Sequence, residues 1–159
     1  MEVSIKITVD QLTNTLDKLS YVCTNREPLM LALSEQLLDC VYENFDQNGR
    51  PAWKGTARGG SILQDSGRLK ASITTDHDNN TAKVGTNVVY AAIHQFGGKT
   101  KPHKILPKRA KALKFGNTYA KSVNHPGSDI PARPFLSVTD GDIQELQETI
   151  EDYILNAIE

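Results

Sequence analysis

The sequence predicts an α+β fold in a single domain that spans residues 1–159. Apolar residues recur every three or four positions toward both ends of the chain, as in helices, whereas apolar and polar residues alternate in the centre, as in half-buried strands. A length of 159 residues suits one hydrophobic core, and no internal repeat divides it. We therefore expect a mostly antiparallel twisted sheet with two N-terminal helices, a short central helix and a C-terminal helix packed on it.

The chain is predicted to begin with a strand and a helix. Residues 3–9 alternate apolar and polar side chains, which is the period of a half-buried strand. Asp10 is expected to cap a helix that carries Leu12, Leu16 and Leu19 on one stripe.

A second, longer helix is predicted after residue 24. Thr24 and Glu27 have the spacing of a capping box, and Pro28 falls in the first turn, where an amide N–H has no intrahelical partner. The apolar positions follow the helical period, and we expect this helix to pack on a sheet. They are Met30, Leu33, Leu37, Val41 and Phe45.

Residues 46–66 are predicted to form a long loop, because they are rich in glycine and polar residues; they also include Trp53, the only tryptophan. "DQNG" lacks the full ligand spacing of a calcium loop, and "GTARGG" lacks the Gly-Lys-Ser/Thr ending of a phosphate loop. No calcium or nucleotide site is indicated.

The centre of the chain is predicted to contain two strands and a short helix. Leu69, Ala71, Ile73 and Thr75 alternate with polar residues, and "DHDNN" gives a turn into "TAKVGTN". In "YAAIHQFGG" the side chains of Tyr90, Ile93 and His94 have one-turn spacing, and Gly97 stands where a helix takes its left-handed stop.

A second long loop is expected over residues 99–112, followed by a hairpin that turns at Gly116 and Asn117. Prolines stiffen the segment "HPGSDIPARPFL". The last helix begins with Thr139 as cap and Asp142 three residues later. It is expected to bury Ile143, Leu146, Ile150, Ile154 and Ile158.

The net charge of −1 conceals a strong separation of charge. Residues 99–114 contain seven cations, His103 and no acid, whereas residues 140–159 contain seven acids and no base. Such polarity suggests head-to-tail contact between copies, or a basic surface that faces a polyanion. A solvated loop and a solvated helix face are the alternative. The cations are Lys99, Lys101, Lys104, Lys108, Arg109, Lys111 and Lys114.

Composition and cysteine content favour a soluble protein made in a cytoplasm. The longest apolar run, "VVYAAI", is far shorter than the roughly 20 residues that cross a bilayer. The N-terminus lacks the cationic start and apolar block of a secretory signal. Cys23 and Cys40 have neither the spacing of a metal knuckle nor the density of a disulfide scaffold, and are expected to be reduced core residues.

His94 is the residue on which an enzymatic function would depend. The histidines His77, His94, His103 and His125 stand in unrelated contexts, without the short-range pairing that places two metal ligands on one helix face. There is no GxSxG motif and no cysteine in a catalytic setting. We expect the ring of His94 to pack under the following loop and bond a backbone carbonyl. No cofactor or metal is predicted.

Four segments, in order, resemble the pattern of the phage virion morphogenesis family, the tail completion proteins of Mu-like and P2-like tailed phages. The similarity covers most of the chain from Phe45 onward, and residues 1–44 contribute little to it. "AKSVNHPG" and "RPFL" are also similar to segments of head-tail joining and neck proteins. The four segments are "FDQNGRPAW" (45–53), "ILQDSGRLKASI" (62–73), "VGTNVVYAAIHQFGG" (84–98) and "IPARPFLSVTDGD" (130–142).

The resemblance implies a non-enzymatic assembly protein of the virion, which completes the tail or neck so that tails join heads. It implies a homo-oligomeric ring, often of six, and contact with other tail or neck proteins. The basic segment would also allow contact with packaged DNA, and no membrane contact is expected. The candidate interface residues are Lys99, Lys101, Lys104, Lys108, Arg109, Lys111 and Trp53.

The family motif residues are expected to act as architecture. Gly97 and Gly98 supply backbone freedom, Pro134 and Phe135 anchor the last helix, and Arg133 ties that junction to a carboxylate or carbonyl. The full set is His94, Phe96, Gly97, Gly98, Arg133, Pro134, Phe135 and Leu136.

Two other functions stay open on the sequence alone. A nucleic-acid-binding module would use the basic segment, although it lacks the interleaved aromatic residues of a single-strand platform and no helix-turn-helix is present. A metal-dependent hydrolase is the second alternative. A pair of carboxylates for acid/base catalysis also stays open, because acids are plentiful, but no two of them stand out.

Overall fold

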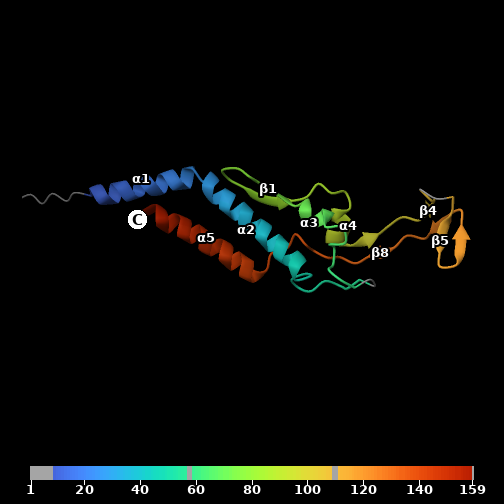
Figure 1. Cartoon of the computed structure of the whole chain (residues 1–159). Coiled ribbons are helices and arrows are strands. Elements are labelled where there is room, and N and C mark those ends of the chain that lie inside the picture. The colour runs from blue at the N-terminus through green and yellow to red at the C-terminus, as the bar shows by residue number, and fades with distance from the viewer. Residues whose placement is uncertain (1–8, 57–58, 109–110, 159) are drawn as a thin grey trace, which may run out of the picture.

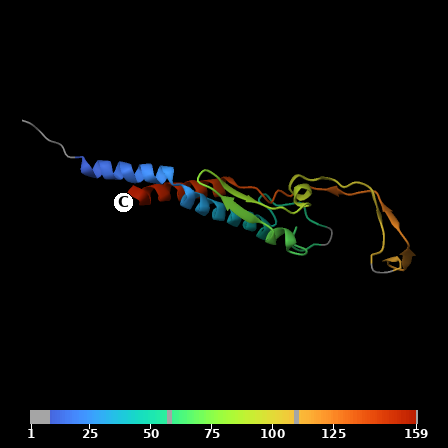
Figure 2. The same cartoon turned by 90° about the horizontal axis from the view of Figure 1, so that it is seen from above.

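The computed structural model describes residues 9–56, 59–108 and 111–158. The molecule is elongated (Figure 1): three long helices lie toward one end, and residues 98–130, which we call the arm, extend from the other. The view from above shows the same separation (Figure 2). The rest of the described chain is called the body. The long helices are α1 (Asp10–Thr24), α2 (Glu27–Asp46) and α5 (Asp140–Ile158).

Helix α1 begins at Asp10 but is not capped by it. Val9 occupies the N-cap position without a side-chain hydrogen bond, so the predicted cap is wrong and Asp10 lies inside the first turn. The side chains of Leu12 and Leu16 are 56% and 55% exposed, and none of the residues of α1 is buried. Of the strand predicted over residues 3–9, positions 3–8 lie outside the described residues.

Helix α2 is the central element of the body. The predicted capping box is wrong, because Thr24 still belongs to α1 and its hydroxyl donates to the Ser20 carbonyl at 2.8 Å. Pro28 lies in the first turn, as expected. The buried side chains of α2 follow the predicted stripe at three of its positions: Leu33, Val41 and Phe45.

Helix α2 packs on a hairpin, which confirms the expected helix-on-strand contact. Strand β1 (Thr74–His77) pairs with β2 (Ala82–Gly85) in antiparallel register, Thr74 opposite Gly85. The predicted strand start at Leu69 is wrong, because α3 (Arg68–Ala71) forms a single helical turn there. The left-handed Gly67 (φ 68°) precedes that turn, and Leu69 is buried.

The fold class is α+β, as predicted, but the strands do not join into one sheet. In the described residues they form four two-stranded antiparallel pairs: β1–β2, β3–β8, β4–β7 and β5–β6. The loop predicted over 46–66 contains no helix or strand after Asp46 in its described residues. The loop predicted over 99–112 instead contains β4 and the end of β3, both in the arm.

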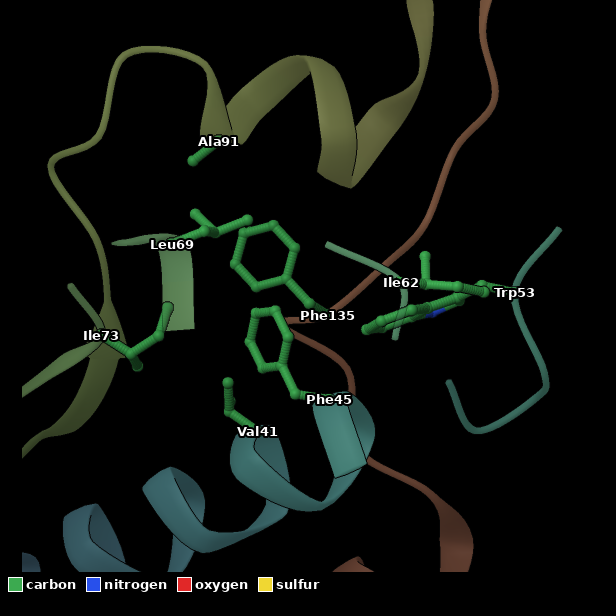
Figure 3. Packing of buried hydrophobic residues seen from close by; sticks show 8 residues of the cluster. All are labelled: Val41, Phe45, Trp53, Ile62, Leu69, Ile73, Ala91 and Phe135. Atoms are coloured by element: carbon green, nitrogen blue, oxygen red, sulfur yellow. The ribbon is translucent and has the colours of Figure 1, made fainter. Parts of the chain in front are cut away.

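The hydrophobic core lies where the C-terminal end of α2 meets the short helices and residues 131–136 (Figure 3). Phe45 and Phe135 are fully buried with ring centroids 5.5 Å apart, and Trp53 meets Phe45 edge-on at 5.8 Å. Each buried aromatic side chain stabilises the fold by about 1.5 to 3 kcal/mol. The rest of the cluster is Val41, Ile62, Leu69, Ile73 and Ala91, so none of its described members belongs to the arm.

Helix α5 packs on α1 and α2 rather than on a sheet, which corrects the predicted packing. Its N-terminal capping box is confirmed: Thr139 N–H donates to the Asp142 carboxylate at 2.7 Å, and Asp142 N–H donates to the Thr139 hydroxyl at 3.2 Å. Ile143 and Ile154 were expected to be buried but are 43% and 37% exposed. Cys40 is buried, whereas Cys23 is exposed and is not a core residue.

Candidate functional site

The arm leaves the body at Gly97, directly after helix α4 (Ala91–Phe96). Gly97 has a φ of 72°, and a Cβ there would stand 2.8 Å from the Ala132 amide nitrogen and 3.0 Å from the Ile130 carbonyl oxygen. Strand β3 (Gly98–Lys99) then pairs with β8 (Asp129–Ile130). Only glycine combines this backbone conformation with so close an approach of the outgoing and returning chains.

Arg133 fixes the returning chain to the body. Its backbone N–H donates to the His94 carbonyl at 2.7 Å, and its side chain is buried. The guanidinium donates to the carbonyls of Lys54 at 3.0 Å and Gly55 at 3.4 Å. The partners are therefore carbonyls, one of the two kinds of group that the sequence led us to expect.

Gln95 is a positioning residue that the sequence reasoning missed. Its side-chain oxygen accepts hydrogen bonds from the backbone N–H groups of Phe135 and Leu136, each at 3.0 Å. Its amide nitrogen donates to the Leu136 carbonyl at 3.3 Å. The Gln95 side chain thus makes three hydrogen bonds with the backbone of residues 135–136, as the backbone of a neighbouring strand would. The residue stands inside "YAAIHQFGG", but a glutamine between a histidine and a phenylalanine gives no signal of this role.

Phe135 was expected to anchor the last helix, but its side chain belongs to a core cluster in which no described member comes from α5. It packs between Phe45 of α2 and the short helices of the core (Figure 3). Pro134 accepts a hydrogen bond from the Trp53 indole N–H at 3.3 Å, and Trp53 is only 8% exposed. Trp53 is therefore a core residue and not an interface residue. Leu136 packs against the same cluster.

The ring of His94 stands edge-on to Tyr90, with ring centroids 5.9 Å apart. Its Nδ1 is buried without a hydrogen-bond partner among the described residues, and no bond from the ring to a backbone carbonyl is found there, so the predicted bond is wrong. The bond found here uses the backbone carbonyl of His94, which accepts from Arg133. Burial, with the positive charge of Arg133 as a smaller cause, lowers the pKa of His94. His94 and Arg133 both line a cavity of about 540 Å³.

Phe96 and Gly98 complete the motif at the root of the arm. Phe96 is 80% exposed, so its side chain does not pack in the core, in contrast to the architectural role expected for it. Gly98 has a φ of 150°, and a Cβ there would only touch the Ile93 side chain at 3.6 Å. The motif thus places one large apolar side chain at the surface where the arm begins.

The arm is a two-stranded ribbon rather than a loop. Beyond β3–β8, strand β4 (His103–Ile105) pairs with β7 (Val123–His125), and β5 (Leu113–Phe115) pairs with β6 (Thr118–Ala120). The predicted hairpin turn at Gly116 and Asn117 is confirmed.

The cations of the arm are exposed. From residue 99 to residue 128 the chain has no acid and eight cations, of which Arg109 lies outside the described residues. Lys99 has one distant partner, Asp129, at 3.6 Å. The other described cations make no ion pair within the described residues. They are Lys101, Lys104, Lys108, Lys111, Lys114 and Lys121.

The opposite charge lies on α2 and α5. Helix α2 carries five acids and helix α5 six, and neither carries a base. A cavity of about 500 Å³ opens between them, and we call it the acidic groove. The carboxylates that line it are Asp39, Glu43, Asp46, Asp142 and Glu145.

Arg50 neutralises the inner part of this groove, and its role was also missed in the sequence. Its guanidinium donates to both carboxylate oxygens of Asp142, at 2.8 and 3.0 Å, and it pairs with Glu43. It also donates to the buried Asn44 side chain at 2.9 Å. Burial alone would raise the pKa of Asp142, but the bonds from Thr139 and Arg50 outweigh it and hold that pKa below its ordinary value.

Neither a metal centre nor a membrane span emerges from the described residues. No three histidine, cysteine or carboxylate side chains in this part of the chain come together as ligands would. Within the same residues, no helix has the length and apolar character needed to cross a bilayer.

Comparison with known proteins agrees with these motifs. Residues 7–155 match the model of the phage virion morphogenesis family, which is not a known enzyme class. The chain is 39% identical to the Mu-like prophage FluMu G protein 2 of Haemophilus influenzae over 145 residues, which cover 90% of this chain and 88% of the relative.

A second relative is the putative capsid assembly protein G of Escherichia phage Mu. It is 26% identical over 175 aligned positions, covering 99% of this chain and 97% of the relative. No solved structure gives a significant match. The chain therefore belongs to the phage virion morphogenesis family and has a role in virion assembly.

Proposed function

We propose that this protein completes the tail or neck of a tailed phage, so that finished tails join filled heads. The observation that carries the proposal is the exposed basic arm on a body whose helices α2 and α5 are acidic. A folded body with a projecting charged ribbon suits a protein that bridges neighbours in an assembly, because both surfaces are available without unfolding.

The name of one relative and the sequence motifs, taken together, support a position at the junction of head and tail. The phage Mu relative is named as a putative capsid assembly protein, whereas the sequence motifs resemble those of tail completion proteins. A protein of the neck or of the head-proximal tail end contacts both structures, which reconciles the two descriptions. The protein is then part of the virion and is made in the cytoplasm of the bacterial host.

We further propose that the protein acts as a ring of identical copies, with six as the number that the resemblance implies. In this role it contacts other tail or neck proteins and acts as a structural protein without catalysis. Residues 1–159 serve as one assembly domain, of which the arm is an extension and not a second domain.

Deletion of the gene, followed by electron microscopy of the lysate, tests the proposed function. Separate filled heads and free tails are expected, and expression of the intact protein in trans should restore joined particles. A lysate of normal virions from the deletion strain would refute the role in joining. Empty or aberrant heads with no free tails would instead place the function in capsid assembly.

The acid-free arm also favours a second candidate, contact with DNA. Six or more phosphate contacts by lysine and arginine would make binding fall steeply with salt. Titration of duplex DNA at 20 to 200 mM salt, roughly the range in which such contacts are lost, measures this. Absence of binding at the lowest salt would remove this candidate, and steep salt-dependent binding would support it.

A further inference from the structure

We propose that the tip of the arm, residues 111–121, docks in the acidic groove between α2 and α5 of a second copy of this chain. This inference deepens the proposed function, because it rests on the protein working as an assembly of copies. It names the two surfaces that meet and the order in which they connect successive copies.

The arm tip carries exposed aromatic side chains, and its cations make no ion pair within the described residues. Phe115 and Tyr119 are 52% and 66% exposed. In the β5–β6 register Lys114 stands opposite Tyr119, and its ammonium lies 5.9 Å from the centre of that ring. On the other face Phe115 stands opposite Thr118. A narrow ribbon with an aromatic side chain on each face and cations beside it is shaped to enter a groove.

The acidic groove offers matching chemistry. Two of its carboxylates, Asp39 and Glu145, are exposed and make no ion pair within the described residues. Its other carboxylates already form ion pairs. Arg50 pairs with Glu43 and Asp142, and Lys70 pairs with Asp46. Tyr42 adds an aromatic side to the groove. The cavity of about 500 Å³ has room for an aromatic side chain and an ammonium group.

The arm and groove of one molecule cannot meet, because the arm points away from its own groove, so the contact we propose joins two copies. Figures 1 and 2 place β4 and β5 at one extremity of the molecule, far from α2 and α5 in both views. A contact between arm and groove is therefore heterologous. Repetition of such a contact gives a closed ring when the rotation between copies closes, and a filament when it does not.

Charge reversal on each side, followed by mixing, tests the proposal. The arm variant is Lys111→Glu/Lys114→Glu/Lys121→Glu, and the groove variant is Asp39→Lys/Glu145→Lys. Both change exposed side chains, and circular dichroism melting shows whether each variant keeps its fold. The masses of the purified proteins are measured by light scattering and sedimentation at low salt.

We expect the intact protein to exceed its monomer mass of 17.5 kDa at low salt and to dissociate as salt rises, since exposed ion pairs are screened over about 10 Å at 0.1 M. Each variant alone should need about tenfold or more protein to associate, because like charges then meet. An equal mixture should recover assembly, since acidic arm tips then face basic grooves and basic arm tips face acidic grooves.

A matched control reverses two exposed cations of the body, Lys54→Glu/Lys83→Glu, and should associate like the intact protein. The inference is overturned if the intact protein stays monomeric at low salt, or if the arm variant associates as well as the control. It is also overturned if two folded variants stay monomeric when mixed. If a groove variant fails to fold, Asp39→Asn/Glu145→Gln replaces it, and this milder change should still weaken association.

These measurements use purified protein and are independent of the phage. Restored assembly in the mixture, together with normal virions from the deletion strain, would refute the proposed function and leave the arm contact standing. Failure of mixing, together with separate heads and tails in the lysate, would refute the arm contact alone.

Discussion

Single polar side chains hold the root of the arm, and Gln95 alone makes three hydrogen bonds there. It satisfies the backbone groups of Phe135 and Leu136 where the extended chain returns to the core. An extended segment without a strand beside it would otherwise leave these groups unpaired on burial, which costs more than a hydrogen bond gains.

Gln95→Ala should lower the free energy of unfolding by about 2 to 4 kcal/mol, because two backbone N–H groups lose their acceptor. Urea unfolding of the purified protein measures the change. Gln144→Ala is the control, since Gln144 bonds only the exposed Glu148, at 3.2 Å. Equal stability of the two variants would mean that water replaces the Gln95 amide at no cost.

His94 should make the protein less stable as the pH falls. Its pKa is lowered in the folded state by burial and by Arg133. Below about pH 6.5, His94 is therefore protonated more readily in the unfolded chain than in the folded one. The contribution is complete above that pH and is lost as the pH falls toward the folded pKa.

His94→Gln should therefore lose less stability than the unchanged protein between pH 7.5 and about 5.5. Urea unfolding of both proteins at the two pH values provides the comparison, and the other histidines cancel in the difference. Parallel losses in the two proteins would show that His94 takes up its proton equally well when folded.

For single residues, the sequence predicted the kind of interaction better than the groups that take part in it. Arg133 was expected to bond a carboxylate or a carbonyl, and carbonyls are what it bonds. Trp53 was placed among the candidate interface residues, yet it is buried against Phe45. Spacing along the chain cannot reveal that residues 53 and 134 meet, and this contact decides where the indole lies.

Between elements, the ion pair of Arg50 and Asp142 is a buried connection with two hydrogen bonds. It joins the turn after α2 to the first turn of α5, and both side chains are largely buried, with 14% and 6% exposed. A buried pair of this kind is costly to break from one side, because the remaining charge keeps its desolvation penalty.

Asp142→Ala should reduce the free energy of unfolding by about 3 to 5 kcal/mol at neutral pH. The pKa of Asp142 is lowered in the folded state, so its contribution is present above about pH 4 and is lost as the pH falls through the folded pKa. Thermal unfolding at pH 7 and pH 3 should show the difference from the intact protein shrinking in acid. Asp140→Ala, in the same turn but exposed, is the control, and a loss equal to that of Asp142→Ala would contradict the role of the pair.

The helices could be predicted because their signals are local. Pro28 marked the first turn of α2, and the pairing of Thr139 with Asp142 marked the start of α5. The single sheet was wrong because strands of two to four residues carry too little alternation to reveal their partners. Residues 99–112 looked like a loop because their lysines and prolines interrupt the apolar alternation that would have predicted a strand, although β4 pairs with β7.

For the whole molecule, the arm and the body should be separable in stability. None of the described core residues belongs to the arm, and the arm strands pair with one another. Replacement of residues 103–125 by a short Asn-Gly linker should change the free energy of unfolding of the body by no more than about 1 kcal/mol.

The same shortened protein should fail to restore joined particles to a deletion strain. Urea unfolding measures the first expectation, and electron microscopy of the complemented lysate measures the second. Joined particles at normal yield would show that the arm is dispensable, and the proposed arm contact would then have no role in the virion.

Because the body holds the core and the arm holds the proposed contact surface, the two parts should change at different rates during evolution. Substitutions in the body are judged first by whether Phe45, Trp53 and Phe135 still pack. Substitutions or length changes near the tip of the arm do not affect this packing, since they remove no buried side chain. A lineage that meets a new neighbour can therefore alter the ribbon quickly while its core stays nearly constant. Among relatives, we expect variation in length to gather between β4 and β7.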